Sequence, residues 1–289
     1  MRIASNQYKS IMLFALQELK NVYPQEEIKA LVYYLFAELI GVSRSDYLLN
    51  PNKGVSESEL LKFNFAIKDL KNGKPIQHIL GYAYFLEKTF IVNKETLIPR
   101  PETEELVQYI ISKEQTHKDL KILDIGTGTA CIPISLGLAM PQHKYSALDF
   151  KTSIIDLAEK NAQKHEIPIS FKVKDILQCE AKDMQEYDII ISNPPYVLES
   201  EKAEMHKNVL EYEPYSALYV KDNDALLFYK KIIELAKQRL SKKGRIYLEI
   251  NENKATETET LLKQNGFSKI LVHKDIHDKN RFVSAILNP

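Results

Sequence analysis

Apolar positions from about residue 120 onward come in short runs, separated by longer segments with helical spacing. In the segments SIIDLAEKNAQKH and LLFYKKIIELAKQRL, apolar residues recur every three or four positions. Strands that alternate with such helices predict βαβ units and a mainly parallel, doubly wound α/β sheet. Because the last two runs are close together, we expect an antiparallel pair at one edge. The predicted strands are KILDIG, KYSALDF, SFKVKD, YDIIISN, GRIYLEI, SKILVHK and FVSAIL.

The first seventy residues show helical spacing instead and predict a small helical bundle. The clearest helix lies between Pro24 and Gly41, residue types that suit a helix start and a helix end. Similar spacing at 12–19 and 60–70 predicts two further helices. The apolar face of the clearest helix comprises Ile28, Leu31, Val32, Leu35, Phe36 and Leu39.

A turn-rich break, KNGKP, separates the bundle from the rest of the chain. YAYFLEKTFIV then alternates as a hairpin does, and a loop with two prolines precedes a helix that we expect to begin at Glu102 or Thr103. We therefore expect three parts: a helical domain at 1–74, a hairpin and linker at 75–101, and a sheet domain at 102–289.

The composition argues against nucleic acid and acidic membranes as partners. The 289 residues are 44% hydrophobic, which supports sizeable cores. Thirty-nine basic residues balance thirty-nine acidic ones, so no overall field attracts nucleic acid or an acidic membrane. The N-terminus lacks a signal-peptide pattern, and the longest apolar block is well short of the ~20 residues of a spanning helix. We expect a cytoplasmic protein in which Cys131 and Cys179 are buried thiols. HKDIHD straddles a strand end, so we expect no metal site.

The first chemical signal is the glycine turn in LDIGTGTACIPISL. A strand, a glycine turn and a helix, followed by Asp149 at the end of the next strand, form a pattern that binds adenosine. Asp124 beside the turn disfavours a pyrophosphate but favours the ammonium and sulfonium cations of S-adenosylmethionine. The sequence therefore predicts S-adenosylmethionine as the cofactor. The alternative is a glycine turn that serves only tight packing of a strand against a helix.

The second signal is DIIISNPPYVLES, in which a buried strand ends abruptly at Asn193. A residue before proline is held extended, so the Asn193 side-chain oxygen and the Pro194 carbonyl can be fixed as two acceptors. Neither Pro194 nor Pro195 offers a competing N–H. Two such acceptors suit an NH2 on a planar group, against which Tyr196 can stack. This predicts methyl transfer to an amino group whose lone pair is delocalised. The alternative is a proline-punctuated loop that merely ends a strand.

Four stretches together resemble a known family. PIQHILGYAYF, LIPRPETEELV, NPPY and EYEPYSAL are similar to the release factor glutamine methyltransferases (PrmC, also called HemK), from about Pro75 to the end. The resemblance implies a class I methyltransferase fold, with a seven-stranded sheet whose last strand is antiparallel and a small N-terminal helical bundle. It implies N5-methylation of the glutamine in the Gly-Gly-Gln motif of class I peptide chain release factors, with S-adenosylmethionine as the donor.

The resemblance also implies roles for individual residues. Asn193 and Pro194 would hold the glutamine amide, and Tyr196 would pack against it. Pro195 and Arg100 are further candidates for the substrate site, Arg100 because its stiff loop between two prolines could close over cofactor or peptide. Arg100 can also be read as a plain surface residue. The implied cofactor site comprises Asp124, Gly126, Thr127, Gly128, Thr129, Ala130, Asp149, Asp175, Ile176 and Asn193.

Some positions depart from the family pattern. Ala130 stands where a third glycine is frequent, and Ile176 where a large aromatic residue is frequent. EINENK at 249–254 replaces an E-x-G-x-x-Q pattern, so we assign no role there. The polar segment 197–211 is interpreted either as a cover over the site or as a solvent loop.

Other functions stay open at this point. A ribosomal-protein glutamine methyltransferase would use the same chemistry, and so would an N6-adenine methyltransferase that flips a base into the same acceptors. Acidic stretches near the site and the zero net charge argue against nucleic acid. A non-catalytic module with the same fold is a further alternative. We expect a monomer that binds class I release factors, without membrane or direct nucleic-acid contact.

Overall fold

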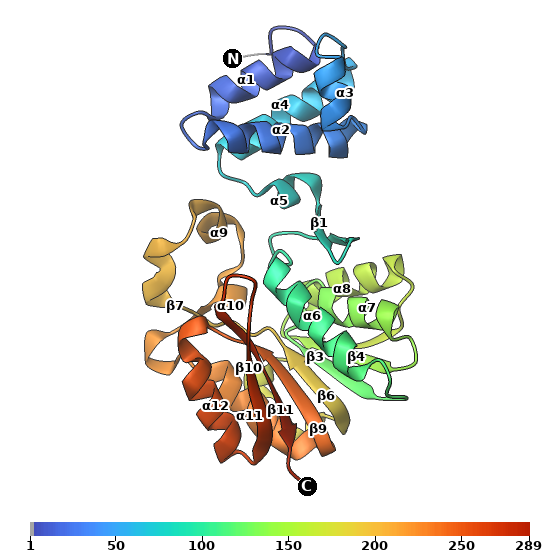
Figure 1. Cartoon of the computed structure of the whole chain (residues 1–289), viewed down its shortest axis with the longest axis vertical. Helices are drawn as coiled ribbons and strands as arrows, with labels where there is room; N and C mark the ends of the chain where they lie inside the picture. The colour runs from blue at the N-terminus through green and yellow to red at the C-terminus, as the bar shows by residue number, and fades with distance from the viewer. Residues whose placement is uncertain (1–2) are drawn as a thin grey trace. The chain divides into compact units, whose positions relative to one another are not determined.

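The computed structural model describes residues 3–289, with the backbone alone at 204 and 207. By its contacts the chain forms two compact units. The first contains the chain up to Gly81 together with His206–Tyr212, and the second contains Tyr82–Met205 and Glu213–Pro289 (Figure 1). The division at 74 and 101 expected from the sequence stays a prediction.

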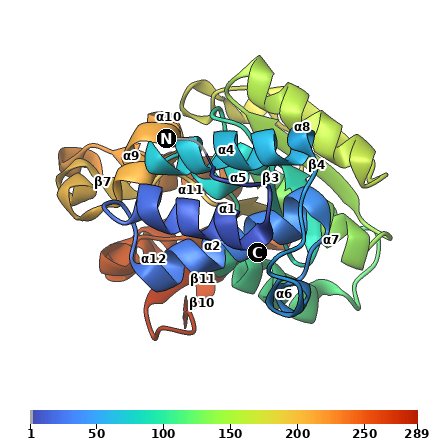
Figure 2. The ribbon, with the colours of Figure 1, turned by 90° about the horizontal axis from the view of Figure 1, so that it is seen from above.

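The first unit is a helical bundle, as predicted. Its core includes Phe36 and Phe63, whose ring centroids lie 4.7 Å apart. Helices end and begin where the sequence marks them: Gly41 adopts the left-handed conformation with φ of 66°, and Ser43 and Ser56 each form a capping box. The first, second and fourth helices pack against one another (Figure 2). The helices are α1 (Tyr8–Leu19), α2 (Gln25–Ile40), α3 (Arg44–Leu49), α4 (Glu57–Lys71), α5 (Ile76–Leu80) and α9 (Lys207–Tyr212).

The second unit begins with the predicted hairpin, β1 (Tyr82–Phe85) paired antiparallel with β2 (Lys88–Ile91). Leu86 and Glu87 at its turn both have positive φ, which matches the twist of the two strands. Helix α6 (Pro101–Glu114) then begins earlier than Glu102 or Thr103, so that expectation was wrong. The reason is that the fixed φ of proline suits the first helical position.

The sheet confirms the predicted α/β class. Its order is β10-β11-β9-β6-β3-β4-β5, and β11 runs antiparallel to the other strands of the sheet. The chain passes from β3 outward to β5 and then returns to β6 beside β3, so the sheet has its switch point between β3 and β6. The strands are β3 (Lys121–Ile125), β4 (Lys144–Asp149), β5 (Ile169–Val173), β6 (Tyr187–Ser192), β9 (Leu240–Glu249), β10 (Phe267–Lys274) and β11 (Asn280–Leu287).

Helices cover both faces of this sheet (Figure 1). Strand β6 shows the alternation: Ile189 and Ile191 pack on one face, and Ile190 on the other. The first face carries α6, α7 (Cys131–Ala139) and α8 (Thr152–Lys164), and the second carries α11 (Leu227–Arg239) and α12 (Ala255–Gln264). The short elements are η1 (Ile176–Gln178), η2 (Ala181–Asp183), β7 (Val197–Leu198), η3 (Glu199–Glu204), α10 (Tyr215–Leu218), β8 (Tyr219–Val220), η4 (Asp222–Asp224) and η5 (Glu252–Lys254).

Helix composition also bears on the membrane. Within residues 3–289, no helix combines the length and the apolar composition that a bilayer crossing requires. The first half of α2, for example, carries Glu26 and Glu27.

Candidate functional site

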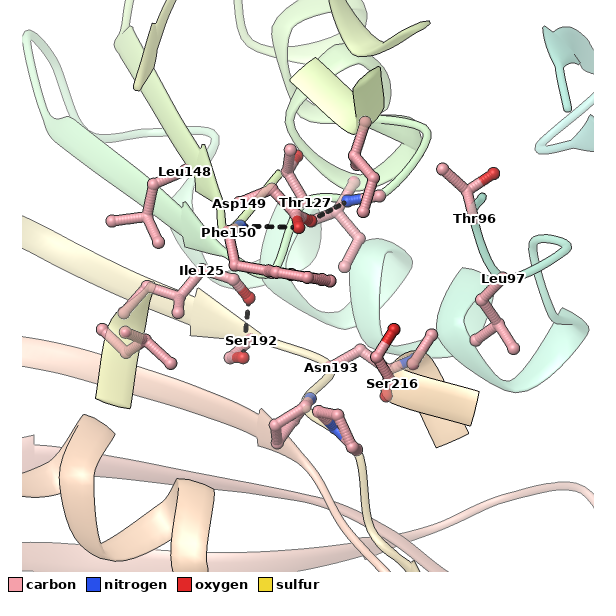
Figure 3. Close-up of a pocket in the computed structure, with 18 of the residues that line it drawn as sticks. Thr96, Leu97, Ile125, Thr127, Leu148, Asp149, Phe150, Ser192, Asn193 and Ser216 are labelled. Carbon is pink, nitrogen blue, oxygen red and sulfur yellow. Dashed lines mark hydrogen bonds between the residues drawn. The ribbon is translucent and has the colours of Figure 1, made fainter. Parts of the chain in front are cut away.

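A cavity of about 280 Å³ opens at the carboxyl ends of β3, β4 and β6, at the switch point of the sheet (Figure 3). Most of the residues that the sequence singled out line it: Arg100, Gly126, Thr127, Gly128, Thr129, Asp149, Asp175, Ile176, Asn193, Pro194 and Pro195. Three do not, namely Asp124, Ala130 and Tyr196. The structure thus brings the glycine turn and the NPPY segment to one place, as expected for residues that follow neighbouring parallel strands.

The glycine turn depends on left-handed backbone. Gly126 and Gly128 have φ of 72° and 54°, and a Cβ added at either would meet no atom within 4 Å. The glycines therefore serve the conformation and keep the cavity wall bare. Ala130 also has a positive φ, 61°, and precedes α7. The chain therefore holds a left-handed conformation here with an alanine.

Asp149 faces the turn from the end of β4. One carboxylate oxygen accepts a hydrogen bond from the Gly128 N–H at 2.9 Å, and the other from the Phe150 N–H at 2.8 Å. Burial raises the pKa of Asp149, while these two N–H groups oppose the rise. Each oxygen has a second lone pair, so the carboxylate can still accept from a diol. Phe150 was missed by the sequence analysis, although its ring lies among the lining residues (Figure 3).

Asp124 lies beneath the turn and is 1% exposed. Neither of its oxygens accepts a well-formed hydrogen bond from a described residue. Burial raises its pKa to about 7; the nearby Thr127 hydroxyl opposes the rise and the Asp149 charge adds to it. Asp124 does not line the cavity, so a ligand there would sense its charge, when it is ionised, and not contact it.

The far wall of the cavity is shaped by Asp175 and the residues after it. The Asp175 carboxylate accepts from the Leu177 N–H at 2.9 Å and from the Gln178 side chain at 3.1 Å, which caps η1. Ile176, 8% exposed, supplies an apolar surface beside it. The cavity also contains the buried thiol of Cys131, whose pKa burial raises to about 12, so it stays protonated.

The buried hydroxyl group of Thr96, on the cavity wall, forms no hydrogen bond with a described residue. A buried hydroxyl without a partner costs about 1–3 kcal/mol, so this group marks a place where a ligand can supply the partner. Together with the Asp149 carboxylate and the apolar Leu148 and Ile176, it fits an adenosine with a cationic tail.

Asn193 follows β6 and is held in place by a hydrogen bond to Thr103. Its Nδ2 donates to the Thr103 Oγ1 at 3.1 Å, and the Thr103 hydroxyl donates to the Glu249 Oε2 at 2.7 Å. Glu249 ends β9 and is 1% exposed. The sequence analysis assigned no role to Glu249 or Thr103. A charged residue at the carboxyl end of a buried strand was the signal that could have found Glu249.

Tyr196 is placed differently from the sequence interpretation. Its hydroxyl donates to the other Glu249 oxygen, Oε1, at 3.0 Å, and its ring packs against the core under α11. The expectation that this ring stacks on the substrate has no support in this geometry. Pro195 lines the cavity instead.

The Arg100 side chain is held in an ion pair and does not extend freely into solvent. Its Nη2 contacts the Glu213 Oε1 at 2.5 Å, and the second Glu213 oxygen accepts from the Ile98 N–H at 3.0 Å. The LIPRPE and EYEP stretches therefore meet at one buried carboxylate beside the cavity. Glu213 was quoted in the resemblance but was given no function in the sequence analysis.

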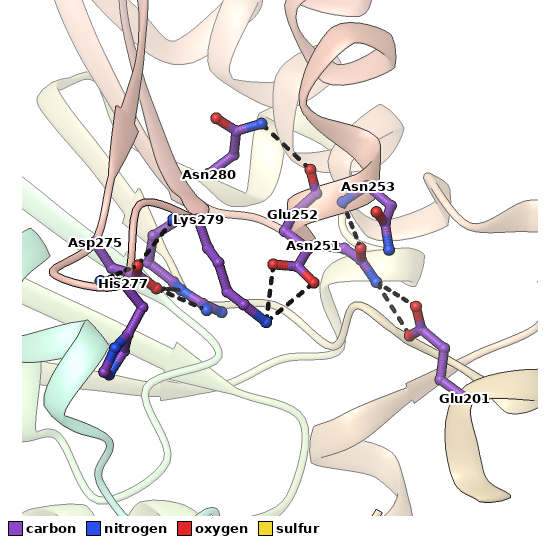
Figure 4. Close-up of polar contacts among 9 residues, drawn as sticks. Glu201, Asn251, Glu252, Asn253, Asp275, His277, Lys279 and Asn280 are labelled. Carbon is purple, nitrogen blue, oxygen red and sulfur yellow. Dashed lines mark hydrogen bonds and ion pairs between the residues drawn. The ribbon is translucent and has the colours of Figure 1, made fainter. Parts of the chain in front are cut away.

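The EINENK stretch also has a structural role (Figure 4). Asn251 donates from Nδ2 to the Tyr196 carbonyl at 3.2 Å and to the Glu201 Oε2 at 3.1 Å. It thereby anchors the first part of the 197–211 segment, which forms β7 and η3, to the end of β9. In HKDIHD, Asp275 binds the Arg281 guanidinium through Nε at 3.0 Å and Nη2 at 2.9 Å.

Comparisons with known proteins show the family to which the chain belongs. The family models "Methyltransferase small domain" and "PrmC N-terminal domain" match residues 103–212 and 12–81. The chain is 45% identical over 272 residues to a release factor glutamine methyltransferase of Flavobacterium psychrophilum, covering 93% of this chain and 95% of the relative. The one of Bacteroides thetaiotaomicron is 37% identical over 275 residues, covering 95% and 98%.

A solved structure shows that the fold is shared more widely. The T. thermophilus 16S rRNA N2 G1207 methyltransferase, in complex with AdoMet and guanosine, superposes with a TM-score of 0.50 at 16% identity, covering 72% of this chain and 50% of that one. That likeness concerns the sheet and its helices. Identity to the curated relatives extends along nearly the whole chain, and on that ground the protein belongs to the release factor glutamine methyltransferase family.

Proposed function

We propose that this protein transfers a methyl group from S-adenosylmethionine to the side-chain amide nitrogen, N5, of the glutamine in the Gly-Gly-Gln motif of class I peptide chain release factors. The observation that carries the proposal is the Asn193 side chain, held by Thr103 on the wall of a cavity that fits a cationic adenosine. Membership of the family supports the choice of glutamine over a nucleic-acid base.

The cofactor residues follow from the cavity wall. Asp149 would accept from the ribose hydroxyls, and Phe150 and Ile176 would flank the adenine. The bare turn at Gly126 and Gly128 lets the ligand approach the backbone closely. S-adenosylmethionine supplies the methyl group on a positively charged sulfur. The negative charge of Asp124 under the turn, when ionised, favours that cation.

Asn193 and Pro194 would orient the substrate amide. Since Asn193 Nδ2 is used by Thr103, its Oδ1 is the end left to accept from the glutamine NH2, and the Pro194 carbonyl is the second acceptor. An amide nitrogen is a poor nucleophile because its lone pair is delocalised. Accepting both of its hydrogens raises its electron density and aims it at the methyl group. A nitrogen–carbon bond forms as the carbon–sulfur bond breaks, and the methylated nitrogen, now acidic, releases one proton to water.

The partner and location that go with this function are also proposals. The protein would bind a class I release factor in the cytoplasm, acting as a monomer and without direct contact to nucleic acid. A protein substrate needs more contact area than the NPPY segment offers, so further surface must take part.

The test is mass spectrometry of a purified class I release factor after incubation with the protein and S-adenosylmethionine. We expect one added methyl group on the peptide that contains the Gly-Gly-Gln glutamine. A release factor with that glutamine changed to glutamate is the matched control substrate and should gain none. Methylation elsewhere, or of neither substrate despite measured cofactor binding, would refute the proposal.

A further inference from the structure

A chain of hydrogen bonds links Asn193 to a buried carboxylate that lies behind it. Asn193 Nδ2 donates to Thr103 Oγ1, and Thr103 Oγ1 donates to Glu249 Oε2. Three separate elements supply these residues: the end of β6, the first turn of α6 and the end of β9. Thr103 and Glu249 are 3% and 1% exposed, so water cannot replace either contact without rearrangement.

The direction of this chain is dictated by chemistry. An ionised carboxylate only accepts hydrogen bonds, so the single hydroxyl hydrogen of Thr103 must point at Glu249. The Thr103 oxygen can then only accept from its other neighbour. Asn193 must therefore turn its NH2 toward Thr103, which leaves Oδ1 as the end available to a ligand. Each group has one orientation open to it once Glu249 is charged.

The surroundings of Glu249 bear on that charge. Burial raises its pKa, whereas the hydrogen bonds from Thr103 and Tyr196 and the positive charge of Arg281 oppose the rise. Both carboxylate oxygens accept from a hydroxyl group, an arrangement suited to the ionised form. A buried charge is a poor way to gain stability, since well-packed apolar side chains do as well. Its position behind Asn193 points to specificity of orientation instead.

We propose that Glu249 and Thr103 are positioning residues that hold the Asn193 amide with its oxygen toward the substrate nitrogen. The inference rests on the proposed function, because it assigns Asn193 Oδ1 as an acceptor for the glutamine NH2. If the Asn193 amide were reversed, its NH2 group would face the NH2 group of the substrate glutamine, and no hydrogen bond could form between them. It would lose the acceptor that stabilises the transition state, an effect of the order of 10²–10³ in rate for comparable groups.

The decisive comparison is Thr103→Val against Thr103→Ser. Valine keeps the shape and removes the hydroxyl, whereas serine keeps the hydroxyl. We expect Thr103→Val to lower kcat for release factor methylation about 100-fold, with the Kd of S-adenosylmethionine changed less than about threefold, and Thr103→Ser to recover most of the loss. Wild-type kcat in Thr103→Val, or equal loss in both variants, would overturn the proposal.

Thr258→Val is the matched control. Thr258 of α12 is also buried, and its hydroxyl donates to the Lys254 carbonyl at 2.8 Å, outside the cavity wall. It should cost stability through the lost hydrogen bond without lowering kcat. A loss of kcat as large as that of Thr103→Val would show that any buried threonine has this effect, and would also overturn the proposal.

Glu249→Gln tests the origin of the direction. A glutamine at position 249 can donate from its NH2 group to the Thr103 oxygen. The Thr103 hydroxyl can then donate to Asn193, so the Asn193 amide is no longer held in one orientation. Because both substitutions act through the same chain of hydrogen bonds, the kcat of the double variant Thr103→Val/Glu249→Gln should be no lower than that of Thr103→Val alone. If the two losses of kcat multiply in the double variant, the residues do not act through one chain of hydrogen bonds. If Glu249→Gln does not fold, the valine and serine pair decides.

One readout is independent of methyl transfer and so separates this proposal from the proposed function. The side-chain NH2 signals of Asn193, assigned by their absence in Asn193→Ala, should shift in Thr103→Val and stay in place in Thr103→Ser. Unchanged signals in Thr103→Val would overturn the positioning role. If the signals shift in Thr103→Val as expected but the wild-type protein methylates no release factor, the proposed function alone would be refuted.

Discussion

Arg100 and Glu213 lie 113 positions apart in the chain, yet the guanidinium of one contacts the carboxylate of the other at 2.5 Å. The Glu213 side chain is 1% exposed and that of Arg100 33%. The contact fixes the loop before α6, which lines the cavity, to the segment before α10, and α10 itself contributes Ser216 and Ala217 to the cavity wall.

Removing Arg100 should therefore destabilise the second unit. The Glu213 carboxylate would remain buried with only the Ile98 N–H as a partner, and an uncompensated buried charge is costly. Because Arg100 is partly exposed, we expect a coupling energy of about 1–3 kcal/mol between Arg100→Ala and Glu213→Ala, measured by urea unfolding.

The more exposed pair Glu259 and Lys263 of α12, at 2.7 Å, is the control for that cycle. Its coupling energy should be no more than about 0.5 kcal/mol, as for surface ion pairs in helices. Equal coupling in the two pairs would show that burial adds nothing to the Arg100–Glu213 contact.

Asn193→Ala should lower kcat by two to four powers of ten. The substitution removes the acceptor proposed for the substrate NH2 but leaves the walls around Asp149 intact, so the Kd of S-adenosylmethionine should hardly change. Methyl-transfer assays at saturating cofactor measure kcat, and calorimetry measures the Kd of S-adenosylmethionine. Asn265→Ala, at the end of α12, is the control for loss of an amide elsewhere. Turnover that survives in a correctly folded Asn193→Ala protein would contradict the mechanism.

Asp149→Ala should act on binding instead. Loss of hydrogen bonds to a charged acceptor is worth about 1.5–3 kcal/mol, so the Kd of S-adenosylmethionine should rise about 10- to 100-fold. The rate at saturating cofactor should fall much less. Isothermal calorimetry measures the affinity. An unchanged Kd would remove Asp149 from the cofactor site.

Asp124 predicts a pH dependence of stability with a definite sign. Its pKa is raised from 3.8 to about 7 in the folded protein. Between these values the folded state keeps a proton that the unfolded state loses, so this group favours folding below pH 4 and loses that contribution as pH rises to about 7. Asp124→Asn should abolish this loss and raise the melting temperature at pH 8 relative to the wild type.

The same variant should bind S-adenosylmethionine more weakly at pH 8, since the cationic ligand loses a nearby negative charge. In the wild-type protein the affinity should increase as pH rises through about 7. Thermal unfolding and calorimetry between pH 5 and 8 check both statements. Parallel pH curves for wild type and Asp124→Asn would count against a titrating Asp124.

The fold and most residues of the cavity wall could be predicted from the sequence, whereas the residues behind Asn193 could not. The hydrophobic runs place Asp149 and Asn193 at the carboxyl ends of two parallel strands, β4 and β6, which flank β3, and the structure confirms that both residues line the cavity at that edge. Glu249 escaped because its partners Thr103 and Tyr196 lie 146 and 53 positions away, and no local pattern encodes such pairings. Tyr196 shows the other limit: a strand pattern fixes the edge at which a residue lies, whereas side-chain torsions decide which neighbour its hydroxyl meets.

The first unit is discontinuous, because His206–Tyr212 belongs to it by contact and the Tyr212 hydroxyl donates to the Asn72 carbonyl at 3.0 Å. A ribosome that has released only the first eighty-one residues has not yet supplied the whole of that unit. Its last helix emerges only after β3 to β6 have been synthesised. The core of the bundle lies among residues before Gly81, so α9 and the contact at Asn72 are added to it late in translation. A truncated gene fragment ending at Gly81 would produce helices that lack α9 and the contact at Asn72.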